Sequence, residues 1–250
     1  MGVIYIGDRF SGKTHLAMEL ANPKCNHVKV VSPSYDQLKS MLYDEENSST
    51  KATDAAKSVY QRFIQLQVTL PTGNKQISVD WLDTPGEIWR ASWREDNPKE
   101  WEDFMQNIRS SEGVLLIMSP YRESLDSHPE KDLYITQQQW INRFNRWVDF
   151  FRHECPNLRH ILICLNKADL FCEEFSREAG KLAYKPHGAG MNWQQRQSYV
   201  CNQYFRPVLP SIEEINRSIR GLSVRCFITS VHERSLLELP WIYLATFLAT

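Results

Sequence analysis

Residues 7–14 have the sequence GDRFSGKT, which matches the pattern G-x-x-x-x-G-K-[ST]. Loops of this pattern hold phosphate oxygens on their backbone N–H groups. An apolar run at residues 3–6 predicts a strand before the loop, and THLAMELA at residues 14–21 predicts a helix after it. A strand, a tight turn and a helix N-terminus in this order form a nest of N–H donors for an anion. The sequence therefore predicts a nucleoside triphosphate ligand.

We call residues 7–14 the phosphate loop, and its residue types have chemical reasons. Gly7 and Gly12 let the backbone turn with its N–H groups pointing inward. The ammonium group of Lys13 can reach the β- and γ-phosphates, and the hydroxyl of Thr14 can bind Mg²⁺. The other positions of the loop belong to the same predicted site and are Asp8, Arg9, Phe10 and Ser11.

Downstream, two runs of alternating apolar and polar residues predict a β-hairpin. The first run covers residues 60–70, a turn is predicted at 72–75, and the second run covers 76–87 and ends in Asp-Thr-Pro-Gly-Glu. Asp83 comes at the carboxyl end of the second strand, where ligand sites of open α/β sheets collect, and can hold Mg²⁺ through water. The N–H of Gly86 can bond the γ-phosphate, so this loop can sense whether that phosphate is present.

Two continuous apolar runs, at residues 112–119 and 160–169, predict parallel strands covered on both faces, and residues 224–232 predict a last strand. Between the first two runs lies a long helical pattern with an aromatic stripe that is typical of core packing. The stripe consists of Trp140, Phe144, Val148 and Phe151. The apolar C-terminal segment is too short for a membrane span and predicts a packed helix with Pro240 in its first turn.

Residues 166–169, Asn-Lys-Ala-Asp, end the second apolar run. The carboxylate of Asp169 can accept two parallel hydrogen bonds from the N1–H and N2–H₂ groups of guanine. Adenine offers no such pair of donors, and a buried carboxylate left unpaired is costly. The small-residue turn at 229–231 can offer the Val231 N–H to guanine O6. These features predict a preference for GTP over ATP.

In this order, the phosphate loop, Asp-Thr-Pro-Gly-Glu, the run at 112–119, Asn-Lys-Ala-Asp and Thr-Ser-Val resemble the motifs of P-loop GTPases of the Ras-like, translation-factor-related class. The resemblance covers about residues 1–170 and 222–250. It implies an α/β fold with a mostly parallel six-stranded sheet and helices on both faces, in one GTPase domain over residues 1–250. It also implies GTP/GDP and Mg²⁺ binding, with a two-state cycle set by the γ-phosphate.

The resemblance assigns roles to the residues at matching positions. The phosphate and magnesium positions are Lys13, Thr14, Asp83 and Gly86. The guanine positions are Asn166, Lys167 and Asp169, joined by Ser230 and Val231 from the last turn. The Mg²⁺-binding threonine of the first switch is expected shortly before residue 60, with Thr53 as the first choice and Thr50 as the second.

Two departures from the Ras-like pattern concern hydrolysis. Glu87 stands where a Gln usually orients the attacking water, and an ionised Glu there is repelled by the γ-phosphate unless it serves as a base. Arg9 stands where Gly is usual, and it acts as an arginine finger in cis, blocks one from a partner, or points to solvent. The catalytic candidates are Lys13, Glu87 and Arg9, and we expect slow or partner-dependent hydrolysis.

Two insertions extend the minimal domain. Residues 28–58 lengthen the first switch, with an added strand at 28–32 and an added helix at 35–46. Residues 171–221 replace a short connection and predict a polar segment followed by two helices broken by prolines. Inserts of this general kind occur in bacterial Ras-like GTPases and in GTPases of bacterial conflict systems, which is an analogy at the level of the fold.

The second switch, taken as residues 84–104, holds Trp89, Trp93 and Trp101. Two interpretations are open: the three rings are core residues, or they form a partner-facing surface that moves with the γ-phosphate. Under the second interpretation, a protein effector or regulator binds this region.

Composition limits the other function classes. A formal net charge of −1 gives no reason to expect nucleic acid as a primary partner. Neither a leader peptide nor a lipid-anchor pattern is evident, and six cysteines without a C-x-x-C pair predict reduced thiols, so we expect a cytoplasmic protein. The run His153-Glu154-Cys155 fits no standard zinc spacing.

Two functions are therefore carried forward. In the first, the protein hydrolyses GTP to GDP with Mg²⁺ and acts as a molecular switch that controls a protein partner. In the second, it is a GTP- or GDP-loaded structural or regulatory subunit of an assembly, with little turnover. A third function, ATP hydrolysis, is disfavoured by Asp169.

Overall fold

The computed structural model describes most of the chain. It covers residues 2–8, 10–44, 49–50, 60–83, 91–125, 128–155 and 157–248. At residues 43–44, 49–50, 60–62, 82–83 and 91 the description is limited to the backbone. Four predicted site residues, Arg9, Thr53, Gly86 and Glu87, therefore lie outside the described residues, as does Trp89.

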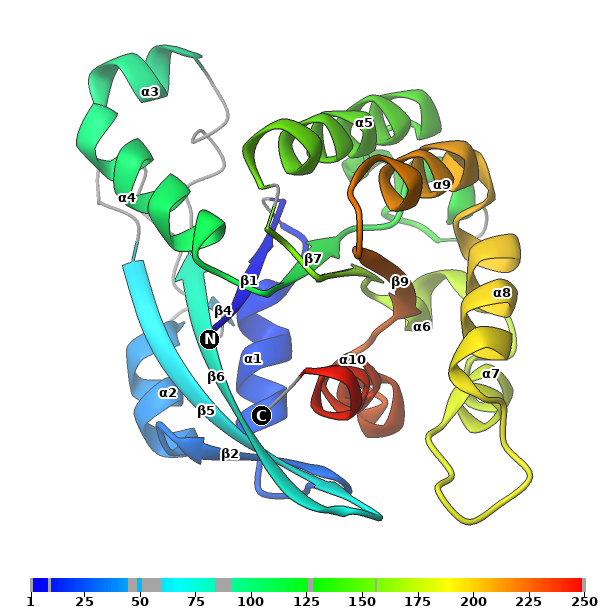
Figure 1. Ribbon diagram of the computed structural model, residues 1–250. Coiled ribbons are helices and arrows are strands. Elements are labelled where there is room, and N and C mark those ends of the chain that lie inside the picture. The colour runs from blue at the N-terminus through cyan, green and yellow to red at the C-terminus, as the bar shows by residue number, and fades with distance from the viewer. Residues whose placement is uncertain are drawn as a thin grey trace.

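A seven-stranded sheet forms the centre of the molecule, in the order β2-β5-β6-β1-β7-β8-β9 (Figure 1). The strands are β1 Val3–Gly7, β2 Val28–Ser32, β5 Tyr60–Leu70, β6 Gly73–Asp83, β7 Gly113–Met118, β8 His160–Leu165 and β9 Ser223–Ile228. Strand β5 runs antiparallel to both of its neighbours, and β6, β1, β7, β8 and β9 are parallel. The predicted α/β class with a mostly parallel sheet is confirmed.

The predicted number of six strands is wrong, because β2 pairs with β5 and adds a seventh strand at that edge. The added strand itself was expected from the sequence at 28–32. A separate two-stranded ladder joins β3 (Tyr43–Asp44) to β4 (Ser49–Thr50) in the same insertion. The extended first switch therefore contributes to the edge of the main sheet as well as to a small ladder beside it.

Helices cover both faces of the sheet, as predicted. In Figure 1, α1 and α10 lie on one face, and α4, α5 and α9 lie on the other. Helix α8 packs beside β9 at the end of the sheet. The helices are α1 Lys13–Ala21, α2 Tyr35–Leu42, α3 Ala91–Asp96, α4 Pro98–Arg109, α5 Gln137–Glu154, α6 Ala168–Phe171, α7 Phe175–Leu182, α8 Trp193–Tyr204, α9 Leu209–Ser218 and α10 Arg234–Phe247.

The hydrophobic core lies between these layers. All six residues of β7 are buried, as expected for a parallel strand with helices on both sides. The predicted core stripe of α5 is confirmed, and Trp147 joins it: the buried residues are Trp140, Phe144, Trp147, Val148 and Phe151. A capping box between Thr136 and Gln139 starts this helix.

Two details of the prediction are wrong. The hairpin turn was expected at 72–75, but β6 already begins at Gly73, whose positive φ of 118° lets the chain reverse within Pro71 and Thr72. Pro240 was expected in the first turn of the last helix, yet α10 begins at Arg234. The carboxylate of Glu233 accepts from the Ser235 N–H, so the helix starts about one and a half turns before Pro240.

The 171–221 insertion contains one helix more than predicted. Helices α8 and α9 were expected, and Pro210 lies in the first turn of α9, whereas the segment that contains α7 was predicted only to be polar and to end in a Gly-rich loop. Helix α7 is short and buries only Ala179 and Leu182, although Phe175 and these two residues stand at i, i+4 and i+7 on one face. It is held in place by Glu178, whose carboxylate accepts from the hydroxyls of Tyr199 (2.7 Å) and Tyr204 (3.1 Å).

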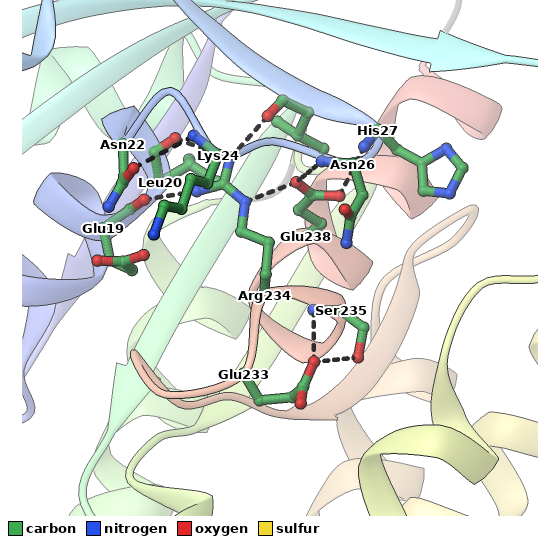
Figure 2. Close-up of polar contacts among 11 residues, drawn as sticks. Glu19, Leu20, Asn22, Lys24, Asn26, His27, Glu233, Arg234, Ser235 and Glu238 are labelled. Carbon is green, nitrogen blue, oxygen red and sulfur yellow. Dashed lines mark hydrogen bonds and ion pairs between the residues drawn. The ribbon is translucent and has the colours of Figure 1, made fainter. Parts of the chain in front are cut away.

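A buried ion pair fastens α10 to the segment after α1, as Figure 2 shows. Arg234 donates to Glu238 at 2.6 Å and also to the backbone oxygens of Glu19, Leu20 and Val28. Glu238 accepts from the backbone N–H groups of Asn26 and His27 at 3.0 and 2.8 Å. We call these two side chains the α10 clamp. It adds hydrogen bonds to C-terminal carbonyls of α1, one of which, that of Glu19, also accepts from the Asn22 N–H at the end of the helix.

Two further expectations were reduced, buried cysteine thiols and the lack of a membrane span. All six cysteines are free, and all but Cys25 are buried. Within the described part of the chain, no helix combines the length and apolar character that crossing a bilayer requires.

Candidate nucleotide-binding site

The phosphate loop connects β1 to α1 in the tight form that its glycines predict. Gly12 adopts φ 83° and stands at the N-terminus of α1. A Cβ on Gly12 would lie 2.6 Å from the amide nitrogen of Asn166, and one on Gly7 would collide with the carbonyl oxygen of Ile117. Both positions therefore require glycine for close backbone approach, and Gly12 also for its left-handed conformation.

Lys13 lies across the loop. Its Nζ donates to the carbonyl oxygens of Gly7 and Asp8, both at 2.9 Å, and the side chain is largely buried. The hydroxyl of Tyr5, from β1, donates to the Lys13 carbonyl at 3.0 Å and fixes the start of the helix. The ammonium charge is thereby held at the N-terminus of α1, where the helix dipole also attracts anions.

Neighbouring strand ends support the loop from outside. Asn166, directly after β8, donates through Nδ2 to the Ser11 carbonyl at 2.8 Å, and its Oδ1 accepts from Thr229 at 3.2 Å. Ser119, directly after β7, donates to the carbonyl of Phe10 at 3.3 Å. Asn166 is buried, and its two hydrogen bonds link the loop to the carboxyl ends of β8 and β9.

Substitution Asn166→Ala is expected to lower the free energy of unfolding by about 1–3 kcal/mol, because it leaves the Ser11 carbonyl and the Thr229 hydroxyl without this partner in a buried place. Urea unfolding measures the change. The matched control is Asn202→Ala on the exposed side of α8, which should change stability little. Equal effects of the two variants would show that Asn166 does not anchor the loop.

A polar pocket opens beside the loop, and we call it the base pocket. Helix α6 and the turn after β9 form two of its walls, and the segment before α5 forms a third. Its lining residues are Gly12, His15, Tyr134, Asn166, Lys167, Asp169, Leu170, Val231 and His232.

Asp169 presents its carboxylate to this pocket. Oδ1 accepts from the hydroxyl of Ser230 at 2.5 Å, and that hydroxyl in turn accepts from the His232 N–H at 3.1 Å. Oδ2 lies 4.0 Å from Nε2 of His232, and the side chain is 22% exposed. The carboxylate is thus oriented by its neighbours while it keeps accepting capacity toward the pocket.

Lys167 and Tyr134 form the opposite wall. Lys167 takes a left-handed conformation with φ 63°, and its Nζ donates to the Tyr134 hydroxyl at 3.1 Å. The same ammonium group lies 4.9 Å from the centre of the Tyr134 ring. Partial burial and the Lys167 charge lower the pKa of His15, so its imidazole is neutral at pH 7.

Five of the predicted phosphate and guanine positions line this pocket: Gly12 of the phosphate loop, Asn166, Lys167, Asp169 and Val231. Ser230 contacts Asp169 and does not line the pocket itself.

Sequence reasoning missed four lining residues: His15, Tyr134, Leu170 and His232. His15 directly follows the phosphate loop and Leu170 directly follows Asp169, so their sequence positions could have predicted them. Tyr134 lies in a polar connection far from any motif, and only the packing of the chain brings it to Lys167.

The predicted magnesium ligands can be located in part. Thr14 is the second residue of α1 and is half-buried. Asp83 ends β6, which runs parallel to β1 with Trp81 opposite Tyr5, so it falls at the loop end of the sheet. A hydroxyl and a carboxylate are hard oxygen ligands that suit Mg²⁺. Thr50 pairs with Tyr43 in the small ladder, and Thr53 lies outside the described residues.

Clusters of three or more His, Cys, Asp or Glu side chains able to hold a metal are absent from the described residues. In nucleotide sites generally, Mg²⁺ takes most of its ligands from phosphate oxygens and water.

Two tryptophans of the second switch, Trp93 and Trp101, lie in the described residues. Trp93 is buried, and Trp101 is half-buried with its ring 5.6 Å from that of Phe104. Arg94 covers the Trp101 ring at 4.1 Å. The core interpretation therefore describes Trp93 and much of Trp101.

No protein-family model matches this sequence, and no curated protein matches it either.

Proposed function

We propose that the protein binds guanine nucleotides with Mg²⁺, hydrolyses GTP to GDP, and acts as a switch that controls a protein partner. One observation carries the proposal. Asn166 hydrogen-bonds the phosphate loop at 2.8 Å, while its neighbours Lys167 and Asp169 line the base pocket. A phosphate-binding element and a carboxylate suited to guanine are thereby joined into one site by a single buried amide.

The chemistry of the two ends is complementary to a guanine nucleotide. Lys13 and the α1 N-terminus supply positive charge for a polyphosphate. The Asp169 carboxylate is held by Ser230 and can accept from the two donors on one edge of guanine. An adenine ring offers no such pair, so it would leave the carboxylate poorly satisfied. Mg²⁺ would be held by Thr14 and Asp83 and would neutralise phosphate charge during hydrolysis.

The second function remains a nucleotide-loaded subunit with little turnover. It is favoured by Glu87, which replaces the usual water-positioning Gln, and by Arg9 in the phosphate loop. Both functions require nucleotide binding, and they differ only in turnover.

A single-turnover time course tests the proposal, with protein in excess over GTP, Mg²⁺ present and ATP as the control. Formation of GDP from GTP by the protein alone, with ATP bound much more weakly, supports a self-sufficient GTPase. Tight GTP binding without product supports the loaded subunit or a switch that needs a partner in trans. Failure to bind GTP, or equal binding of ATP, would contradict the proposed function.

Substitution Glu87→Gln is expected to raise the single-turnover rate by about tenfold, which corresponds to about 1.4 kcal/mol of barrier. The resemblance gives residue 87 the position that faces the γ-phosphate, and the substitution removes a negative charge there. The same time course measures the rate, with Glu95→Gln on α3 as the control. An unchanged or lower rate would show that Glu87 does not obstruct hydrolysis.

A further inference from the structure

The phosphate loop contains a buried carboxylate that its proposed chemistry does not explain. Asp8 directly follows β1, and its side chain is only 10% exposed. Two side chains of α5 hold it: Arg143 Nη1 donates to Oδ2 at 3.4 Å, and Trp147 Nε1 donates to Oδ1 at 3.2 Å. These contacts join residues 135 and 139 positions apart.

A carboxylate in this place opposes the task of the loop. The loop must attract phosphate groups, and a negative charge in the same turn repels them, more strongly where water is excluded. Burial raises the pKa of Asp8, while Arg143, the Trp147 hydrogen bond and Lys13 act in the opposite direction. Arg143 is the principal compensating charge, because Lys13 is the residue expected to bind phosphate.

We propose that Arg143 is a positioning residue of the phosphate loop, which holds the Asp8 carboxylate against α5 and neutralises it so that the loop accepts a polyphosphate. The inference rests on the proposed function, since it concerns the same site. Under this proposal, α5 and the segment before it contact both parts of the site. Arg143 contacts the phosphate loop, and Tyr134 lines the base pocket.

The proposal has a definite pH signature. Without Arg143, a bound polyphosphate favours the protonated form of Asp8, so binding takes up a proton and raises the pKa of Asp8. Affinity must then fall as the pH rises and the carboxylate ionises. With Arg143 present, its positive charge offsets part of this repulsion, and the linkage is smaller. Among the described residues, the charged or polar groups that face Asp8 are Arg143 and Trp147 from α5 and Lys13 from α1.

The test is Arg143→Met, with GTP binding measured by calorimetry from about pH 5.5 to 8.5 in two buffers of different ionisation enthalpy. At the alkaline end we expect about tenfold weaker binding than in the wild type, a coupling typical of linked sites. The deficit should shrink toward the acidic end, and the variant should take up more protons on binding than the wild type. Arg146→Met, at an exposed position of the same helix, is the control and should match the wild type.

Two further variants separate charge from packing. Asp8→Asn with Arg143→Met removes both charges and should restore pH-independent affinity relative to the wild type. Arg143→Lys keeps the positive charge and should bind nearly as the wild type does.

A deficit of Arg143→Met that is constant across pH, or that persists in the double variant, would overturn the inference and leave the proposed function intact. A wild-type protein that binds no guanine nucleotide would instead overturn the proposed function and this inference together.

Discussion

Arg234→Met is expected to lower the free energy of unfolding by about 3–5 kcal/mol, the range for breaking a buried ion pair from one side. Glu238 is 1% exposed and Arg234 is 13% exposed, so the pair is shielded from water. Methionine retains much of the apolar volume of arginine but leaves Glu238 as an uncompensated buried charge. Three backbone carbonyls, of Glu19, Leu20 and Val28, also lose the hydrogen bond that Arg234 donates.

The α10 clamp and the candidate site lie at opposite ends of α1. The clamp contacts the C-terminal end of this helix (Figure 2), and Lys13 is its first residue. Urea or thermal unfolding measures the stability loss. Arg177→Met is the matched control, because the pair of Arg177 with Glu174 is exposed on both sides and surface pairs contribute about 0–1 kcal/mol. Similar losses in both variants would show that the α10 clamp contributes no more to the free energy of unfolding than an exposed ion pair does.

Asp169→Asn is expected to weaken GTP binding by about a hundredfold or more while it leaves the phosphate contacts in place. The size of the expected loss in affinity follows from the number of charge-assisted hydrogen bonds that the substitution removes. An ionised carboxylate can accept two hydrogen bonds from guanine, and each bond to a charged group contributes about 1.5–3 kcal/mol. Asparagine offers one acceptor and places an amide donor against the guanine amino group, so one bond is lost and one contact becomes repulsive.

The same substitution offers a rescue test. Xanthine carries a carbonyl where guanine carries its amino group, so the amide donor introduced by Asp169→Asn finds an acceptor there. Xanthosine triphosphate should therefore bind the variant better than GTP does, and bind the wild type worse. Competition binding with GTP, ATP and xanthosine triphosphate measures all three affinities. Asp149→Asn, on the exposed side of α5, is the control.

Unaltered GTP affinity in Asp169→Asn would remove the guanine assignment, because the predicted bonds would not exist. A uniform loss for all three nucleotides would indicate damage to the fold rather than to base recognition. Only an inverted preference between guanine and xanthine supports the assigned role.

The local motifs and the class of fold were predictable from the sequence. The phosphate loop needs glycines, a lysine and a helix start within a short run of consecutive residues, and continuous apolar runs such as 112–119 predict buried parallel strands. These signals act between chain neighbours, so sequence order alone preserves them. Boundaries were less predictable, as Pro240 shows, because the start of α10 depends on a cap at Glu233.

Long-range polar pairs required the tertiary structure. Asp8 meets Arg143, Tyr134 meets Lys167, and Arg234 meets the end of α1 over a separation of 215 residues. A charged residue in a sequence carries no mark of its partner, since most are solvated at the surface. Chain packing excludes water from a few of them and thereby forces each to be paired. The sequence itself determined which groups can meet a phosphate and a guanine, and only the fold decided which side chains hold those groups in place.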